Sequence, residues 1–66
     1  MQEVTNQIRV LRLRHGITQE ELAENVGVSR QTIIAMEKGN YAPSLLLALK
    51  LAKFFKATVE QLFTIR

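Results

Sequence analysis

The side chains best suited to recognising a ligand lie together at the start of one predicted helix. Arg30 and Gln31 directly follow Ser29, whose hydroxyl is a good N-cap for a helix that runs to about Lys38. Arginine can donate two hydrogen bonds to O6 and N7 of guanine, and glutamine can bond N6 and N7 of adenine in the same two-point way. On an isolated helix both side chains would simply be solvated. Within the helix-turn-helix described below, we expect Gln31 to contact a base edge of DNA, whereas for Arg30 base and phosphate contacts both stay open.

The same helix and its neighbours offer further candidates for contacts with DNA. At helical spacing Ile33 and Met36 point inward, so the opposite side of the helix is left free. Ile34 and Ala35 on that side could pack on a thymine methyl group. Gln19 opens the preceding helix, where a side-chain amide and a helix N-terminus can bind a phosphate. The remaining candidates are polar residues placed to touch phosphates: Ser29, Thr32, Lys38 and Asn40.

Composition limits the other kinds of function that the chain could have. Its 66 residues carry nine Lys and Arg against six Asp and Glu, a net charge of +3 that modestly favours a polyanionic partner. With no cysteine, one histidine, no cofactor loop and no nucleophile beside a base, we expect no metal, no cofactor, no evident small-molecule ligand and no enzyme activity. A secretory signal and an apolar membrane span are also missing, so we expect a cytoplasmic protein with no membrane partner.

Capping residues and glycines divide the chain into five predicted helices. Two capping boxes, opened by Thr18 and Thr58, start the second and the fifth helix. Ser44 is the N-cap of the fourth helix. The first four helices are expected over about residues 5–15, 19–26, 30–38 and 45–56, the fifth is short, and residues 64–66 could be extended. We therefore predict one compact all-α domain over residues 1–66, with its core in about residues 5–63.

The second and third predicted helices have the features of a helix-turn-helix. Gly27 suits the turn between them because the chain there must adopt a positive φ. Ala23, four residues earlier, is small enough for the two helices to approach, and Ile33, six residues later, can fill the space between them.

The segment from Gln19 to Gly39 resembles the lambda-repressor/Cro-like family, also called the XRE family. The flanking segments Ile8–Arg12, Gly16–Thr18 and Tyr41–Leu45 fit the same pattern, so the resemblance covers about residues 5–63. It implies a five-helix, sequence-specific DNA-binding regulator that usually acts as a homodimer. The chain departs from the family at four apolar positions where polar residues are commoner: Val10, Leu13, Ile34 and Leu46.

The resemblance also implies a structural ion pair between Arg12 and Glu37. In this family the matching residues form a partly buried pair between the first and third helices. Such a pair fixes the orientation of two helices more than it adds stability.

The fourth predicted helix has more apolar surface than one core stripe needs. Leu45, Ala48, Leu49, Ala52 and Phe55 form the expected stripe, and three further residues widen the apolar arc to roughly 220°. We expect the surplus to form a two-fold interface, although the fifth helix and the tail could instead cover it. The predicted interface residues are Leu47, Leu51, Phe54, Val59 and Leu62.

Together these features predict a transcriptional regulator that binds double-stranded DNA. Its simplest form is a repressor that binds a palindromic operator as a homodimer, with the third helix in the major groove. The sequence leaves open an activator, the antitoxin of a toxin–antitoxin pair, and a protein-interaction module that uses its apolar surface.

Overall fold

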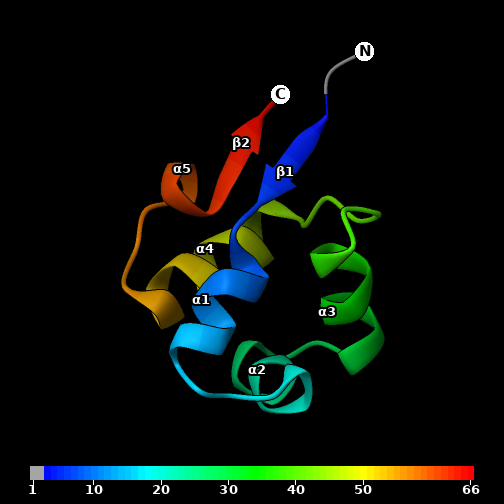
Figure 1. Ribbon diagram of the computed structural model, residues 1–66, viewed down its shortest axis with the longest axis vertical. Helices are drawn as coiled ribbons and strands as arrows, with labels where there is room; N and C mark the ends of the chain where they lie inside the picture. The colour runs from blue at the N-terminus through cyan, green and yellow to red at the C-terminus, as the bar shows by residue number, and fades with distance from the viewer. Residues whose placement is uncertain (1–2) are drawn as a thin grey trace.

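The computed structural model describes residues 3–66, which form five α-helices and two short β-strands (Figure 1). Within these residues no helix combines the length and the apolar composition that a bilayer span requires. In Figure 1 the two strands lie at one end of the long axis and α2 at the other. In chain order the elements are β1 (Val4–Asn6), α1 (Ile8–Arg14), α2 (Gln19–Val26), α3 (Arg30–Glu37), α4 (Leu45–Phe55), α5 (Val59–Leu62) and β2 (Phe63–Ile65).

Side-chain caps begin four of the helices at the predicted residues. The Thr18 hydroxyl accepts a hydrogen bond from the Glu21 amide at 3.0 Å, and the Glu21 carboxylate accepts one from the Thr18 amide at 2.8 Å. Thr58 begins α5 with a capping box of the same kind. The hydroxyls of Ser29 and Ser44 cap α3 and α4. Because each cap satisfies backbone amides that lack an intrahelical partner, these four helix starts were readable from the sequence.

The fold is mostly helical, as predicted, and a small antiparallel sheet of two three-residue strands is added to it. β1 pairs with β2 in the register Val4–Ile65 and Asn6–Phe63, so the first helix begins at Ile8 and not near residue 5. Asn6 explains this boundary, because its side-chain oxygen accepts from the Ile8 amide at 3.1 Å and its nitrogen donates to the Met36 carbonyl at 2.9 Å. β1, and β2 through its pairing with β1, are thereby tied to α1 and α3.

One continuous hydrophobic core joins all five helices. Ala23 and Ile33 are buried in it, as expected for the residues that set the spacing and the packing of α2 and α3. The buried apolar residues are Ile8, Leu22, Ala23, Val26, Ile33, Met36, Leu47, Ala48, Leu51, Ala52, Phe55 and Leu62.

Burial on α4 and α5 corrects three of the predicted dimer-interface residues. Leu47, Leu51 and Leu62 are 5%, 0% and 0% exposed, so they pack in the core of a single chain and cannot contact a partner. Phe54 and Val59 are half-buried.

The uncovered part of the apolar arc of α4 lies at the edge opposite to the one predicted. α2 and α5 pack on the side of α4 that carries Leu47 and Leu51. Periodicity gives the width of an apolar arc, whereas the covered part of that arc depends on the positions of the neighbouring helices. Two leucines of the expected core stripe are therefore exposed, together with a third beside them: Leu45 at 74%, Leu49 at 52% and Leu46 at 63%.

Candidate nucleic-acid interface

The turn between α2 and α3 has the backbone geometry that a helix-turn-helix needs. Gly27 ends α2 in the left-handed region at φ +74°. The Val28 amide then donates to the Ala23 carbonyl at 3.0 Å, which closes the end of the helix. Ser29 immediately caps α3. These contacts fix α3 against α2, with Ile33 and Met36 buried and the opposite side of α3 facing outward.

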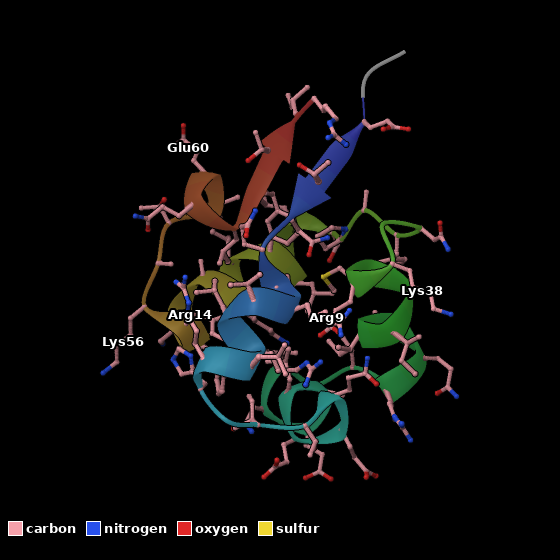
Figure 2. The ribbon with its side chains drawn as sticks, in the orientation of Figure 1. Arg9, Arg14, Lys38, Lys56 and Glu60 are labelled. Carbon is pink, nitrogen blue, oxygen red and sulfur yellow. The ribbon has the colours of Figure 1, made fainter. Side chains whose placement is uncertain are left out.

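The structure places most of the predicted DNA-contacting residues along this outward side or at its ends. Arg30 and Gln31 are exposed in the first turn, and Lys38 is exposed at the far end, where Figure 2 shows it pointing away from the core. Ser29 and Thr32 bond each other through their hydroxyls at 3.1 Å. Of the other predicted residues, Asn40 is exposed, and Thr32, Ile34 and Ala35 are half-buried.

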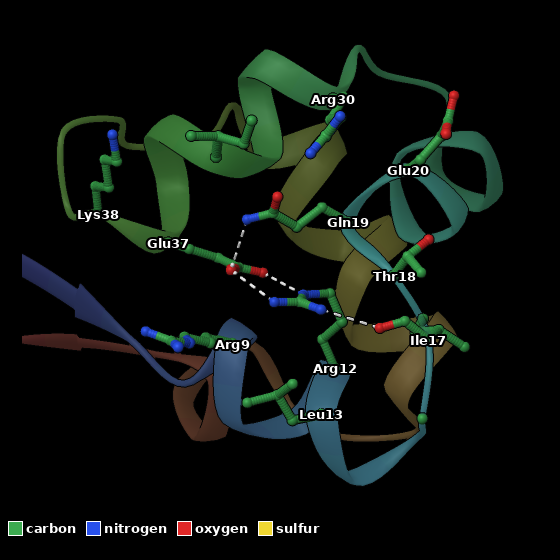
Figure 3. A pocket seen from close by; sticks show the side chains of 12 residues that line it. Arg9, Arg12, Leu13, Ile17, Thr18, Gln19, Glu20, Arg30, Glu37 and Lys38 are labelled. Carbon is green, nitrogen blue, oxygen red and sulfur yellow. Dashed lines mark hydrogen bonds and ion pairs between the residues drawn. The ribbon is translucent and has the colours of Figure 1, made fainter.

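Arg12 and Glu37 form the expected ion pair between α1 and α3. Arg12 Nε donates to Glu37 Oε2 at 2.6 Å and Nη2 donates to Oε1 at 3.1 Å, and the two side chains are only 10% and 5% exposed (Figure 3). Arg12 Nη1 also donates to the Ile17 carbonyl at 3.0 Å. The hydrogen bond with Glu37 raises the pKa of Arg12 above its ordinary value, although burial works against that shift. Each side-chain nitrogen of Arg12 and each carboxylate oxygen of Glu37 has a hydrogen-bond partner, and the opposite charges of the pair cancel.

Gln19 belongs to this network as well as to the start of α2. Its Nε2 donates to Glu37 Oε1 at 3.2 Å. Because the carboxylate needs a donor, the oxygen of the Gln19 amide must face away from it, and Figure 3 shows that oxygen on the side of Arg30. The two residues lie 18 positions apart, and their contact depends on the packing of α2 against α3. Sequence reasoning placed Gln19 correctly at the start of α2 but missed its contact with Glu37.

A groove with a volume of about 810 Å³ runs between α1 and the helix-turn-helix (Figure 3). Arg9 and Leu13 of α1 line it, and neither was among the candidate site residues from the sequence. The signal for Arg9 was its spacing, because it lies three residues before Arg12 and so shares a side of α1 with it. The complete lining is Arg9, Arg12, Leu13, Gly16, Ile17, Thr18, Gln19, Glu20, Arg30, Ile34, Glu37 and Lys38.

The charges in this groove suit a polyanion. Four basic side chains and two carboxylates line it, and the buried pair cancels one charge of each sign. After this cancellation, three exposed basic side chains remain, Arg9, Arg30 and Lys38, and one exposed carboxylate, that of Glu20. Among residues 3–66 no cluster of three or more histidine or acidic side chains is present that could hold a metal ion. The groove therefore borders the outward side of α3 and carries a net positive charge, with apolar residues such as Leu13 and Ile34 between the charged ones.

Comparison with known proteins agrees with this geometry. A helix-turn-helix family model matches residues 8–62. The chain is 57% identical over 58 residues to MJ0272, an uncharacterized HTH-type transcriptional regulator of Methanocaldococcus jannaschii, covering 88% of each chain. It is 55% identical to YgzD of Bacillus subtilis, an uncharacterized protein described in the same way, again over 58 residues and 88% of each chain.

A more distant relative and a solved structure extend the comparison. The chain is 40% identical over 58 residues to the cryptic phage CTXphi transcriptional repressor RstR of Vibrio cholerae, covering 88% of this chain and 52% of RstR. The crystal structure of the restriction-modification controller protein C.AhdI of Aeromonas hydrophila superposes with a TM-score of 0.76 at 33% identity, covering 83% of each chain. The chain therefore belongs to the lambda-repressor/Cro-like, or XRE, helix-turn-helix family of DNA-binding transcriptional regulators, which are not enzymes.

Proposed function

We propose that the protein represses transcription by binding a palindromic DNA operator as a homodimer, with α3 in the major groove. The observation that carries this proposal is the first turn of α3, where Arg30 and Gln31 are exposed side by side. Ile33 and Met36 anchor the other side of the same helix in the core, so the two polar side chains are presented on a rigid element. In helix-turn-helix proteins the N-terminal residues of the second helix contact base edges.

The contacts divide into base-reading and phosphate-binding groups. Gln31 reads a base, and Ile34 and Ala35 lie one turn further along the same helix, where they can pack on thymine methyl groups. Arg30 can reach either a base or a phosphate from its exposed position. Phosphate contacts hold the helix in register without carrying sequence information. The residues proposed for this role are Gln19, Ser29, Thr32, Lys38 and Asn40.

The homodimer is proposed because α4 exposes apolar surface that residues 3–66 leave uncovered. Leu45, Leu46 and Leu49 are all more than half exposed, and a domain of 66 residues has a small core of its own. We place the dimer interface on these leucines. Phe54 and Val59 of the original prediction are half-buried, and Phe54 lies on the opposite edge of the α4 arc from Leu45, so these two residues would contribute only at a separate contact. A two-fold dimer then presents two copies of α3 to successive major grooves, about 34 Å apart.

The repressor role rests on one relative. RstR, with 40% identity to this chain, is named as a transcriptional repressor. An activator or an antitoxin that binds its own promoter would use the same surface of α3, so reporter assays on the selected operator decide between them. A protein-interaction module that uses the exposed leucines of α4 would bind no palindromic duplex.

Selection of bound duplexes from a random DNA pool tests the proposal directly. We expect an approximate palindrome with half-site centres about one helical turn apart. Binding of no duplex, or of every duplex equally, would reject sequence-specific regulation. If the wild type gives a palindrome, the roles within α3 can be separated with two variants.

Gln31→Ala and Lys38→Ala should differ in kind. Gln31→Ala should weaken the free energy of operator binding by about 1–3 kcal/mol and relax the base preference at one position in each half-site. Lys38→Ala should weaken operator and random duplex equally and lower the salt slope by about one per subunit. Equal weakening of both duplexes by Gln31→Ala, with the base preference unchanged, would show that Gln31 is not a reader.

A further inference from the structure

The groove beside the helix-turn-helix has a basic side chain that lies outside the motif. Arg9 belongs to α1, is exposed, and lines the same groove as Lys38 and Arg30. Figure 3 shows Arg9 and Lys38 at the same end of the groove, one on α1 and the other at the end of α3. Two helices therefore contribute positive charge to one end of a groove that also borders the proposed reading surface.

Arg9 is free to bind an external anion, whereas Arg12 is not. Both carboxylate oxygens of Glu37 accept hydrogen bonds from Arg12, at 2.6 and 3.1 Å. Within residues 3–66 the Arg9 side chain makes neither an ion pair nor a hydrogen bond. Its guanidinium therefore keeps all five donors available, and such a planar fork matches the oxygen atoms of a phosphate.

We propose that this end of the groove receives the phosphate backbone of DNA, with Arg9 contacting a phosphate from the α1 side and Lys38 contacting the backbone from the opposite side. The inference rests on the proposed DNA binding, because α3 in the major groove brings a flanking backbone against the groove that Arg30 and Lys38 also line. A DNA backbone fits this groove because it carries a negative charge at every nucleotide. The exposed basic side chains match that pattern, with Arg9 and Lys38 at one end of the groove and Arg30 at the other. The DNA-binding surface then includes α1 as well as the helix-turn-helix.

Arg14 offers a matched control on the same helix. It is an exposed arginine five residues after Arg9, and it does not line the groove. Figure 2 shows the two side chains on different sides of α1. Loss of Arg14 removes the same net charge from the protein without removing the proposed phosphate contact.

The salt dependence of binding separates these two arginines. For Arg9→Ala we expect weakening of operator and random duplex by the same factor, roughly fivefold per subunit at about 0.15 M salt, and a salt slope lower by about 0.9 per subunit. Arg9→Lys should keep most of the slope, and Arg14→Ala should keep all of it. Melting temperatures of the three variants should stay close to that of the wild type, because both arginines are exposed.

Several outcomes would overturn the inference. An unchanged salt slope in Arg9→Ala, or an equal loss in Arg14→Ala, would show that the groove holds no phosphate through Arg9. A changed base preference in Arg9→Ala would show that Arg9 reads sequence and does not bind the backbone. If the wild type binds no duplex, both this inference and the proposed function fail. If the wild type binds DNA and Arg9→Ala binds it equally well, this inference alone is rejected.

Discussion

Replacing Glu37 with alanine should destabilise the fold far more than its position at the end of α3 suggests. The Glu37 carboxylate accepts three hydrogen bonds, two from Arg12 and one from Gln19. In the intact fold the Arg12 residue is only 8% exposed, and without Glu37 its remaining hydrogen-bond partner would be the Ile17 carbonyl. The variant therefore leaves a buried positive charge with no counter-charge.

The expected loss is large for a chain of this size. Removing one partner of a buried ion pair costs about 3–5 kcal/mol, and we take the lower end, about 3 kcal/mol, because Arg12 keeps one hydrogen bond. The whole domain is expected to have a free energy of unfolding of about 3–10 kcal/mol. At about 4–8 °C per kcal/mol for small domains, the melting temperature should fall by about 12–24 °C.

Circular dichroism during thermal and urea unfolding measures this change. Glu24→Ala is the matched control, because Glu24 is exposed on α2 and its side chain makes no hydrogen bond or ion pair with residues 3–66. Both variants must be compared at one protein concentration, since dimer formation would make the melting temperature depend on concentration. A Glu37→Ala variant that melts within a few degrees of Glu24→Ala would refute the structural role of the pair.

The pH dependence gives a second check on the same pair. The pKa of Arg12 is raised in the folded state, so its contribution to stability is complete below the unfolded-state pKa and is lost only as the pH rises through the folded-state pKa. Arginine stays protonated throughout the ordinary range. The difference in melting temperature between wild type and Glu37→Ala should thus be constant from about pH 7 to about pH 10. A difference that shrinks steadily across this range would assign the effect to another group.

Two further predictions concern the turn and the α4 surface. Gly27→Ala should lower the free energy of unfolding by about 1–2 kcal/mol, because an alanine at φ +74° is strained, although its Cβ would meet only the Lys50 Nζ at 3.8 Å. Gly27→Asn should lower it less. Equal urea midpoints for the two variants would contradict this reason. In sedimentation at micromolar concentration, Leu46→Glu should reduce the mass from twice the 7.5 kDa chain to that of the single chain. The control Val10→Glu, at an exposed residue of α1, should leave the dimer intact. A Leu46→Glu variant that is still dimeric would show that the interface lies elsewhere.

Local signals explain why most of the helical fold could be predicted from the sequence. The capping residues Thr18, Ser29, Ser44 and Thr58 act on amides two or three residues away, so the starts of α2 to α5 need no knowledge of the tertiary structure. Gly27 likewise ends α2 through its own backbone conformation. The same holds for the outward side of α3, because the positions of Arg30 and Gln31 follow from the helical period once the start of the helix is known.

The features that sequence reasoning missed all depend on contacts between distant segments. Residues 64–66 were expected to be extended, but their pairing with β1 was missed, because Thr5 and Thr64 lie 59 positions apart and strands of three residues have too short an alternation to predict. In the predicted core stripe of α4, Leu45 and Leu49 were misassigned, because α2 and α5 decide which edge of the apolar arc is covered. Arg9 entered the candidate site only when α1 was placed beside α3, with the groove between them.

The same network connects the stability of the fold to the shape of the proposed DNA surface. Arg12 and Glu37 hold α1 against the end of α3, and Gln19 adds the start of α2 to the same point. Arg9 lies one turn before Arg12 on α1, so this contact also holds the backbone of Arg9 beside the groove that Lys38 lines. Because the charges of Arg12 and Glu37 cancel, the positive charge of the groove comes from its exposed basic side chains and not from Arg12. The two properties are therefore separable by mutation: Glu37 controls how firmly the groove is held together, and Arg9 controls how strongly it attracts a phosphate.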